Sequence, residues 1–325
     1  MTERPFHHLP VMVEEIVAVF ERVPPGFVLD ATLGGGGHAE RLLECWPHLK
    51  VLGIDRDAAA LAAAGERLDR FGDRIRMYHC RFDGLHNAME ALSIDSLSGA
   101  IFDLGVSSPQ LDEPARGFSY RAEAPLDMRM DQSQTWSAAD VVNGYSAPQL
   151  TSMLKRYGDE RFARRIATAI VAARPIETTS QLAEVVVSAI PAPARRTGGH
   201  PAKRTFQAIR IEVNGELDAL PGALDDAIER TVPGGRIAVL SYHSGEDRIV
   251  KQRMRNAESG GCLCPPELPC VCDAVQTVRL VRGVAKTPVS TEVESNRRAS
   301  SARLRVVERI VDTPRRTTRG TGAGR

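Results

Sequence analysis

The stretch Asp30-Ala31-Thr32-Leu33-Gly34-Gly35-Gly36-Gly37-His38 decides the fold. It continues the apolar run Phe27–Leu33, which is typical of a buried β-strand, and a helical pattern follows it. Consecutive glycines let a backbone turn tightly and approach a ligand closely, and the N–H groups of the next helix face an anionic group. The order strand, glycine loop, helix predicts an α/β domain that binds a ligand at this loop.

Two ligand classes fit the glycine loop. The spacing Gly34-x-Gly36-x-x-Ala39 matches the dinucleotide fingerprint, and Asp55 at the end of the second strand is placed to hold ribose hydroxyls. Asp30, four residues before the glycines, favours S-adenosylmethionine, which carries an ammonium and a ribose but no pyrophosphate. A nicotinamide or flavin cofactor is the alternative.

Short apolar runs alternate with helical patterns through the first hundred residues, which predicts right-handed crossovers and a parallel sheet. The predicted strands are Phe27–Leu33, Val51–Asp55, Ile75–Cys80 and Ala100–Val106, and the predicted helices are Val11–Val23, Ala39–Trp46 and Asp57–Phe71.

Beyond Val106 the pattern becomes helical for about a hundred residues, and the strand Gly235–Tyr242 then restores the α/β order. Thr277–Val281 and Leu304–Ile310 are predicted to form an antiparallel edge. We therefore expect a discontinuous domain of residues 1–110 and 206–311, a helical insertion at 111–205, and a disordered basic tail at 312–325. The predicted helices of this half are Ala138–Val142, Pro148–Tyr157, Glu160–Ala173, Thr179–Ile190, Arg204–Val213 and Ala219–Val232.

The composition is that of an ordinary globular protein, with 42% apolar and 26% charged residues in 325. No run is long and apolar enough for a membrane span, and the first residues lack the apolar core of a signal peptide, so we expect a cytoplasmic protein with no membrane partner. Residues 1–150 hold 13 basic and 22 acidic side chains, whereas 151–210 hold 11 and 4. Basic segments on an acidic body suggest a polyanionic partner, although a solvated basic face is an equal alternative.

A second loop, Asp103-Leu104-Gly105-Val106-Ser107-Ser108-Pro109-Gln110, follows the fourth predicted strand. In an open parallel sheet this loop lies at the same edge as the glycine loop. An acid followed by a turn that contains proline is often found here in enzymes that methylate exocyclic amines of bases. Acceptors for the two amine N–H groups help to localise the nitrogen lone pair for attack.

Two further segments carry candidate residues. His243, in Ser241-Tyr242-His243-Ser244-Gly245-Glu246-Asp247-Arg248, follows another strand and is predicted either to act in catalysis or to have a structural role. In the helix predicted at Glu160–Ala173, three arginines lie opposite the apolar face, where they could contact phosphates or only solvent. They are Arg161, Arg164 and Arg165, and the loop after this helical region adds Arg195, Arg196 and Lys203.

Four of the six cysteines form the pattern Cys262-x-Cys264-x5-Cys270-x-Cys272. Four thiols can close a tetrahedral zinc site, although one intervening residue in each pair is fewer than usual. Pro269-Cys270 also matches the nucleophile of cytosine-C5 methyltransferases, but lies far along the chain from the fourth-strand loop. We expect no metal in the catalytic site, and zinc at the cysteines is left open.

With these blocks in place, the chain resembles the bacterial 16S ribosomal RNA (cytosine-N4) methyltransferase family, RsmH or MraW. The most distinctive matching strings are PLDMRMD at 125–131, RTFQAIRI at 204–211 and SYHSGEDRIVK at 241–251, within blocks that span almost the whole chain. Tyr242 stands where the family commonly has Phe and Gly245 where it has Leu, and 296–305 reads NRRASSARLR instead of NPRARSAKLR.

The resemblance implies a Rossmann-like S-adenosylmethionine-dependent methyltransferase domain with an inserted helical, RNA-recognition domain. It implies N4-methylation of a specific cytidine in the decoding centre of 16S rRNA within the small ribosomal subunit, and not of DNA. The implied cofactor contacts are Gly36, Gly37, His38, Asp55, Phe82, Asp103 and Gln110. The residues predicted to align or deprotonate the amine are Asp103, Ser107, Ser108, Pro109 and His243.

Two other functions compete with this interpretation. One is a dinucleotide-dependent oxidoreductase, which would bind NAD instead of S-adenosylmethionine. The other is a ribosome-assembly factor without catalysis, which would bind subunits and leave no methyl group.

Overall fold

A computed structural model describes residues 10–196, 199–265 and 271–314. Two compact units divide the chain: the first consists of residues 1–105 and 219–325, the second of residues 106–218. The insertion thus ends later than the predicted residue 205. Helix α11 (Lys203–Asn214) was assigned to the α/β domain, but it packs against α6 (Ala138–Gly144) and α7 (Ala147–Gly158) of the second unit.

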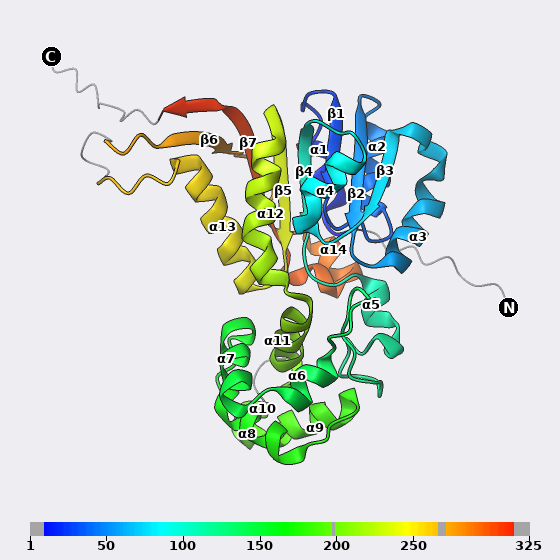
Figure 1. The fold of residues 1–325 in the computed structure, drawn as a ribbon, viewed down its shortest axis with the longest axis vertical. Coiled ribbons are helices and arrows are strands. Elements are labelled where there is room, and N and C mark those ends of the chain that lie inside the picture. The colour runs from blue at the N-terminus through cyan, green and yellow to red at the C-terminus, as the bar shows by residue number, and fades with distance from the viewer. Residues whose placement is uncertain (1–9, 197–198, 266–270, 315–325) are drawn as a thin grey trace. The chain divides into compact units, whose positions relative to one another are not determined.

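The first unit is built on one seven-stranded sheet in the order β3-β2-β1-β4-β5-β7-β6 (Figure 1). Strands β1 to β5 pair in parallel, and β7 and β6 continue the sheet as an antiparallel edge. This topology confirms the predicted Rossmann-like α/β fold and its antiparallel edge. The strands are β1 (Gly26–Asp30), β2 (Leu49–Asp55), β3 (Ile75–His79), β4 (Leu97–Asp103), β5 (Thr231–Ser241), β6 (Val275–Leu280) and β7 (Arg303–Pro314).

Successive side chains of the central strands enter two separate cores, because a strand alternates its side chains between faces. Leu29 and Phe102 pack with residues of α4, α12 and α13, whereas Val28 and Ile101 pack with residues of α1 and α2 on the other face. A smaller cluster joins α2 and α3 to β2 on that second face. These helices are α1 (Val13–Val19), α2 (Gly37–Cys45), α3 (Ala58–Leu68), α4 (Leu85–Ala91), α12 (Glu216–Arg230) and α13 (Ser244–Ser259).

Helices α4 and α13 were not predicted from the sequence. The apolar face of α13 is narrow: only Val250 and Met254 among its apolar residues are fully buried, and charged residues surround them. Its N-terminus lies within Ser241–Arg248, a segment in which the sequence singles out His243 but indicates no helix. Helix α4 has seven residues, too few for a clear period.

Strand β7 extends to Pro314 and pairs with β6 as far as Val275. The predicted tail therefore begins too early, since residues 312–314 belong to the sheet. The remainder of that segment, residues 315–325, lies outside the described residues, as do Cys270 and part of the basic loop at 197–198. No helix among the described residues has the length and hydropathy required to cross a bilayer.

The second unit is helical around a core that includes Leu150, Leu154, Ile166 and Ile170. An irregular segment that contains the string PLDMRMD is fixed by side-chain bonds to its backbone. Asn214 donates to Met128 O and accepts from Met130 N, at 2.8 and 2.9 Å. The remaining helices of this unit are α5 (Ser108–Asp112), α8 (Ala163–Ala173), α9 (Thr179–Ala189) and α10 (Ala192–Arg195).

Gly99 on β4 is expected to tolerate no side chain. A Cβ there would lie 2.4 Å from Arg236 O and 2.6 Å from a ring carbon of Phe20. Gly99→Ala should therefore lower the free energy of unfolding by about 1–3 kcal/mol, measured by urea denaturation. Gly222→Ala in α12 is the control: no atom lies within 4 Å of its Cβ position, so it should be neutral or stabilising by up to about 1 kcal/mol. Equal midpoints for the Gly99 variant and the wild type would contradict this packing.

Candidate active site

Three aspartates end three neighbouring parallel strands of the first unit. Asp30 is the last residue of β1, Asp55 of β2 and Asp103 of β4, and these strands are adjacent in the order β2-β1-β4. Carboxyl ends of parallel strands meet at one edge of the sheet, where ligands of this architecture bind. The edge of the sheet at which the glycine loop begins is therefore strongly acidic.

Asp30 is 1% exposed. The pKa of its carboxyl is raised to about 7, mainly by burial and also by the charges of Asp103 and Asp55, against the lowering effects of His38 and of a hydrogen bond from Thr32 N. Near neutral pH the protonated and ionised forms of this carboxyl are therefore both populated. A cation placed beside it would favour the ionised form.

Asp55 fastens the glycine loop to the sheet. Its Oδ2 accepts from Gly34 N and its Oδ1 from Asp57 N, both at 2.8 Å. Gly34 and Gly36 have positive φ angles of 53° and 76°, which glycine adopts without strain. A Cβ at Gly36 would also lie 2.9 Å from Leu68 Cδ1. The loop therefore requires glycine on both conformational and steric grounds, and burial raises the pKa of the Asp55 carboxyl.

Asp103 is held by groups from three other segments. Its backbone N–H donates to Thr32 Oγ1 at 2.7 Å, and the Tyr242 hydroxyl donates to its Oδ1 at 2.6 Å. His38 Nδ1 lies 3.8 Å from its Oδ2. Burial and then the charge of Asp103 raise the pKa of Tyr242 well above its usual range, so this hydroxyl remains a donor. The carboxylate is therefore oriented before any ligand arrives.

His38 is buried in the first turn of α2 and connects this site to the N-terminal segment. Its Nε2 lies 3.0 Å from Val11 O. Because a carbonyl oxygen only accepts, Nε2 carries the proton of this bond and Nδ1 is the nitrogen that faces Asp103. Gly37 is also closely packed, since a Cβ there would lie 2.4 Å from Pro10.

His243 is the N-cap of α13. Its Nδ1 accepts from the backbone N–H groups of Gly245 and Glu246, at 3.2 and 3.4 Å. Its Nε2 lies 3.0 Å from Oε1 of Glu246, a residue that is 2% exposed. Nδ1 therefore caps the first turn of the helix, whereas the buried Nε2 makes no hydrogen bond within the described part of the chain. The cap gives His243 a structural role, and its catalytic role stays a prediction.

The other predicted residues belong to different units. Phe82 follows β3 and packs edge-to-face on Phe102, with ring centroids 6.3 Å apart. The remaining four belong to the second unit, where they form the start of α5. Ser107 Oγ accepts from Gln110 N at 3.4 Å, and Gln110 Oε1 accepts from Ser107 N at 3.2 Å, which makes a capping box around Ser108 and Pro109.

Sequence reasoning missed the role of Tyr242. In the sequence it stands out only as a departure from a common Phe, although the added hydroxyl is the group that donates to Asp103. Thr32 likewise lies in the glycine loop with no local signal of a role of its own. A polar atom added at the end of a buried strand was the available signal, but its partner lies 139 residues away in the chain.

Comparisons with known proteins agree with these observations. A family model described as the MraW methylase family matches residues 5–310. The ribosomal RNA small subunit methyltransferase H of Thermobifida fusca is 50% identical over 309 residues, which cover 93% of this chain and 93% of that protein. The protein of the same name from Mycolicibacterium smegmatis is 48% identical over 324 residues, covering 95% of this chain and 86% of that one.

The raised pKa of Asp30 predicts a pH-dependent cost to stability. A carboxyl whose pKa is near 7 when folded and 3.8 otherwise loses stability as the pH rises from about 4 through 7. Asp30→Asn keeps the acceptor oxygen but cannot ionise. Its free energy of unfolding should therefore rise relative to that of the wild type as the pH rises, by up to roughly 4 kcal/mol. Urea midpoints of both proteins at several pH values between 4 and 8 measure this. A constant difference would show that Asp30 keeps an ordinary pKa.

Proposed function

Because the chain belongs to the MraW methylase family, we propose that it transfers a methyl group from S-adenosylmethionine to N4 of a specific cytidine in the decoding centre of 16S rRNA. The names of the relatives support small-subunit rRNA as the substrate. The choice of cytidine and of N4 rests on the resemblance of the sequence strings. In this proposal the protein acts in the cytoplasm on the small ribosomal subunit.

The convergence of Asp30, Asp55 and Asp103 carries the cofactor assignment. S-adenosylmethionine supplies an electrophilic methyl group on a sulfonium and also carries an ammonium, and acids at the ends of β1 and β4 suit such cations. Asp55 accepts backbone N–H groups through both of its oxygens, and a carboxylate has about four acceptor sites, so a ribose hydroxyl can also donate to it. Phe82 offers an apolar ring beside the end of β3. Gly36, Gly37 and His38 lie where the glycine loop after β1 enters α2. A dinucleotide would bring a pyrophosphate to this acidic edge, which is unfavourable.

Asp55→Ala should weaken S-adenosylmethionine binding by roughly ten- to a hundredfold, because a hydrogen bond to a charged acceptor contributes about 1.5–3 kcal/mol. Isothermal titration calorimetry measures the affinity. Asp57→Ala is the control, since the Asp57 side chain caps α3 through Ala59 N and should affect stability more than affinity. An unchanged affinity in the Asp55 variant would remove this residue from the cofactor site.

Transfer to an exocyclic amine needs no covalent nucleophile, and alignment of the reacting atoms can supply most of the rate. We assign the alignment to Asp103, whose carboxylate is oriented by Tyr242 and is placed to accept an amine N–H. Ser107, Ser108 and Pro109, which begin α5 a few residues further on, are proposed to offer further acceptors to the amine. The amine proton becomes acidic only after the methyl group is attached, so a base matters less than alignment. Cys270 is not required for this reaction.

Asp103→Asn should therefore slow single-turnover methylation more than His243→Ala, at saturating cofactor and RNA. The Asp103 variant loses a charged acceptor, whereas the His243 variant loses the N-cap of α13, which costs about 0.5–2 kcal/mol of stability. Rapid-quench assays on folded protein give both rates, and thermal unfolding shows the effect of the missing cap separately. The reverse order of rates would mean that proton removal by His243 limits the reaction.

RNA recognition is assigned to the second unit. Arg161, Arg164 and Arg165 are exposed, while Ile166 and Ile170 on the same segment are fully buried. Helix α8 begins only at Ala163, so Arg161 lies in the preceding turn instead of on the helix. Arg195, Arg196 and Lys203 are also exposed. A target base must leave its stack to react, and exposed arginines can hold the flanking phosphates.

Charge reversal of Arg161, Arg164 and Arg165 should weaken binding to small subunits and reduce the slope of log affinity against log salt by about 1 for each phosphate that is no longer neutralised. Filter binding at several salt concentrations measures both quantities. Cofactor affinity should remain that of the wild type, because the substitutions lie outside the first unit. An unaltered salt slope would leave these arginines as a solvated face.

Nucleoside mass spectrometry tests the proposal as a whole. Small subunits that lack the modification are incubated with the protein and S-adenosylmethionine, and N4-methylcytidine is expected at one site in 16S rRNA. Binding of NAD without S-adenosylmethionine would favour an oxidoreductase. Subunit binding without any methyl transfer would favour an assembly factor.

A further inference from the structure

Three cysteines between α13 and β6 converge in the first unit. The sulfur atoms of Cys262, Cys264 and Cys272 all lie within 4.8 Å of one another. Thiolates around a tetrahedral zinc ion with Zn–S bonds of about 2.3 Å lie roughly 3.8 Å apart. The observed separations are thus close to those of a metal site.

Hydrophobic burial does not explain this convergence. Cys262 and Cys264 are half-buried and Cys272 is exposed, while the neighbouring Leu263 and Val271 are 96% and 84% exposed. Apolar side chains thus point to solvent while thiols turn toward each other, the opposite of a small apolar core. A single disulfide would join only two of the three sulfurs.

The backbone at both ends of the loop is built to bring its cysteines together. Gly260 and Gly261, with φ angles of 64° and 71°, turn the chain sharply after α13. A Cβ at Gly260 would lie 2.5 Å from the backbone of Val275, so this turn lies directly against the start of β6. Cys262 N donates to Ser259 O at 3.3 Å, which fixes the first cysteine to the end of the helix.

We propose that Cys262, Cys264 and Cys272 bind a zinc ion as thiolates, each releasing its proton on binding. The ion has a structural role: it joins the end of α13 to the beginning of β6 at the edge of the sheet. The site is separate from the acidic edge that is proposed to bind the cofactor. Zinc favours thiolate ligands, and a ligand set of three cysteines excludes Mg²⁺ and Ca²⁺, which prefer oxygen.

Metal analysis of the full chain, purified without chelator, tests this site. About one zinc ion per chain is expected, and a variant with Cys262→Ser, Cys264→Ser and Cys272→Ser should contain almost none. Cys45→Ser and Cys80→Ser are matched controls that should retain it; burial raises the pKa of the Cys80 thiol to about 11, which makes it a poor ligand. Zinc that persists in the triple variant would overturn the proposal.

Cobalt gives a second test that does not depend on how the variants fold. Wild-type protein freed of metal and titrated with Co²⁺ should develop thiolate-to-metal charge-transfer absorption, which disappears on adding Zn²⁺. Intact mass under non-reducing conditions distinguishes the alternative, because a disulfide lowers the mass by two hydrogens. A disulfide-bonded chain that gives no charge-transfer band after reduction would also overturn the proposal.

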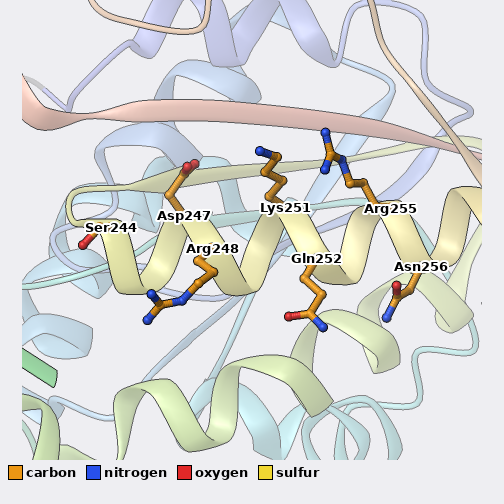
Figure 2. Close-up of a pocket in the computed structure, with 7 residues that line it drawn as sticks. All are labelled: Ser244, Asp247, Arg248, Lys251, Gln252, Arg255 and Asn256. Carbon is orange, nitrogen blue, oxygen red and sulfur yellow. The ribbon is translucent and has the colours of Figure 1, made fainter. Parts of the chain in front are cut away.

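A different observation concerns α13 itself, whose surface holds a shallow hollow lined in part by Arg248, Lys251 and Arg255 (Figure 2). All three are exposed, and none forms an ion pair within the described part of the chain. Asp247 also lines the hollow, and its carboxylate is already paired with Arg305, at 2.7 and 2.9 Å. The three cations therefore lack a paired counter-charge along one helix.

Resting on the proposed function, we infer that this face of α13 binds the phosphate backbone of the rRNA substrate. Arg248→Glu, Lys251→Glu and Arg255→Glu should each weaken small-subunit binding and reduce its salt slope by about 1. Arg22→Glu, at an exposed site elsewhere in the first unit, is the control with the same change of charge and should do neither. Wild-type affinities and slopes in all three variants would overturn this inference alone, whereas absence of methyl transfer by the wild type would count against the proposed function.

Discussion

The crowding of three carboxylates at the ends of adjacent parallel strands is the constraint on which the site depends. Because β2, β1 and β4 pair in parallel, their carboxyl ends lie at one edge of the sheet. Their last residues, Asp55, Asp30 and Asp103, therefore share that edge. Burial raises the pKa of the Asp30 carboxyl to about 7, and the charges of Asp103 and Asp55 add to this effect. Hydrogen bonds from Gly34 to Asp55, from Thr32 to Asp30 and from Tyr242 to Asp103 hold the three carboxyl groups in place despite this repulsion.

Each acid has a different set of partners, and this separates their functions. Asp55 accepts backbone N–H groups and thereby shapes the glycine loop. Asp103 accepts the Tyr242 hydroxyl and remains partly exposed, so it can still reach a substrate. Asp30 is enclosed, and its burial raises the pKa of its carboxyl. One acidic edge can thus combine loop geometry, alignment and electrostatic attraction.

The strands and the glycine loop could be predicted from the sequence because their signals are local. Apolar runs of strand length and consecutive glycines need no knowledge of partners, and all seven strands were found. The Tyr242–Asp103 bond could not be predicted, since it joins strands β4 and β5 across 139 residues. The end of the insertion was predicted too early, at residue 205, for a related reason. The sequence of α11 is that of an ordinary amphipathic helix, and only its packing on α7 assigns it to the second unit. The capping role of His243 could not be predicted either, because the residue type alone does not show whether a histidine caps a helix or acts as a base.

The acidic edge also links stability to ligand preference. A buried carboxyl with a raised pKa destabilises the folded protein whenever it is ionised, and that cost is relieved when a cation binds beside it. A sulfonium donor brings such a cation, whereas the thioether left after methyl transfer no longer carries that charge. The same buried charge that reduces stability would therefore favour the donor over its product, which aids product release. Local destabilisation of this kind is common at functional sites, where it is offset by packing elsewhere, here by the two cores on either side of the sheet.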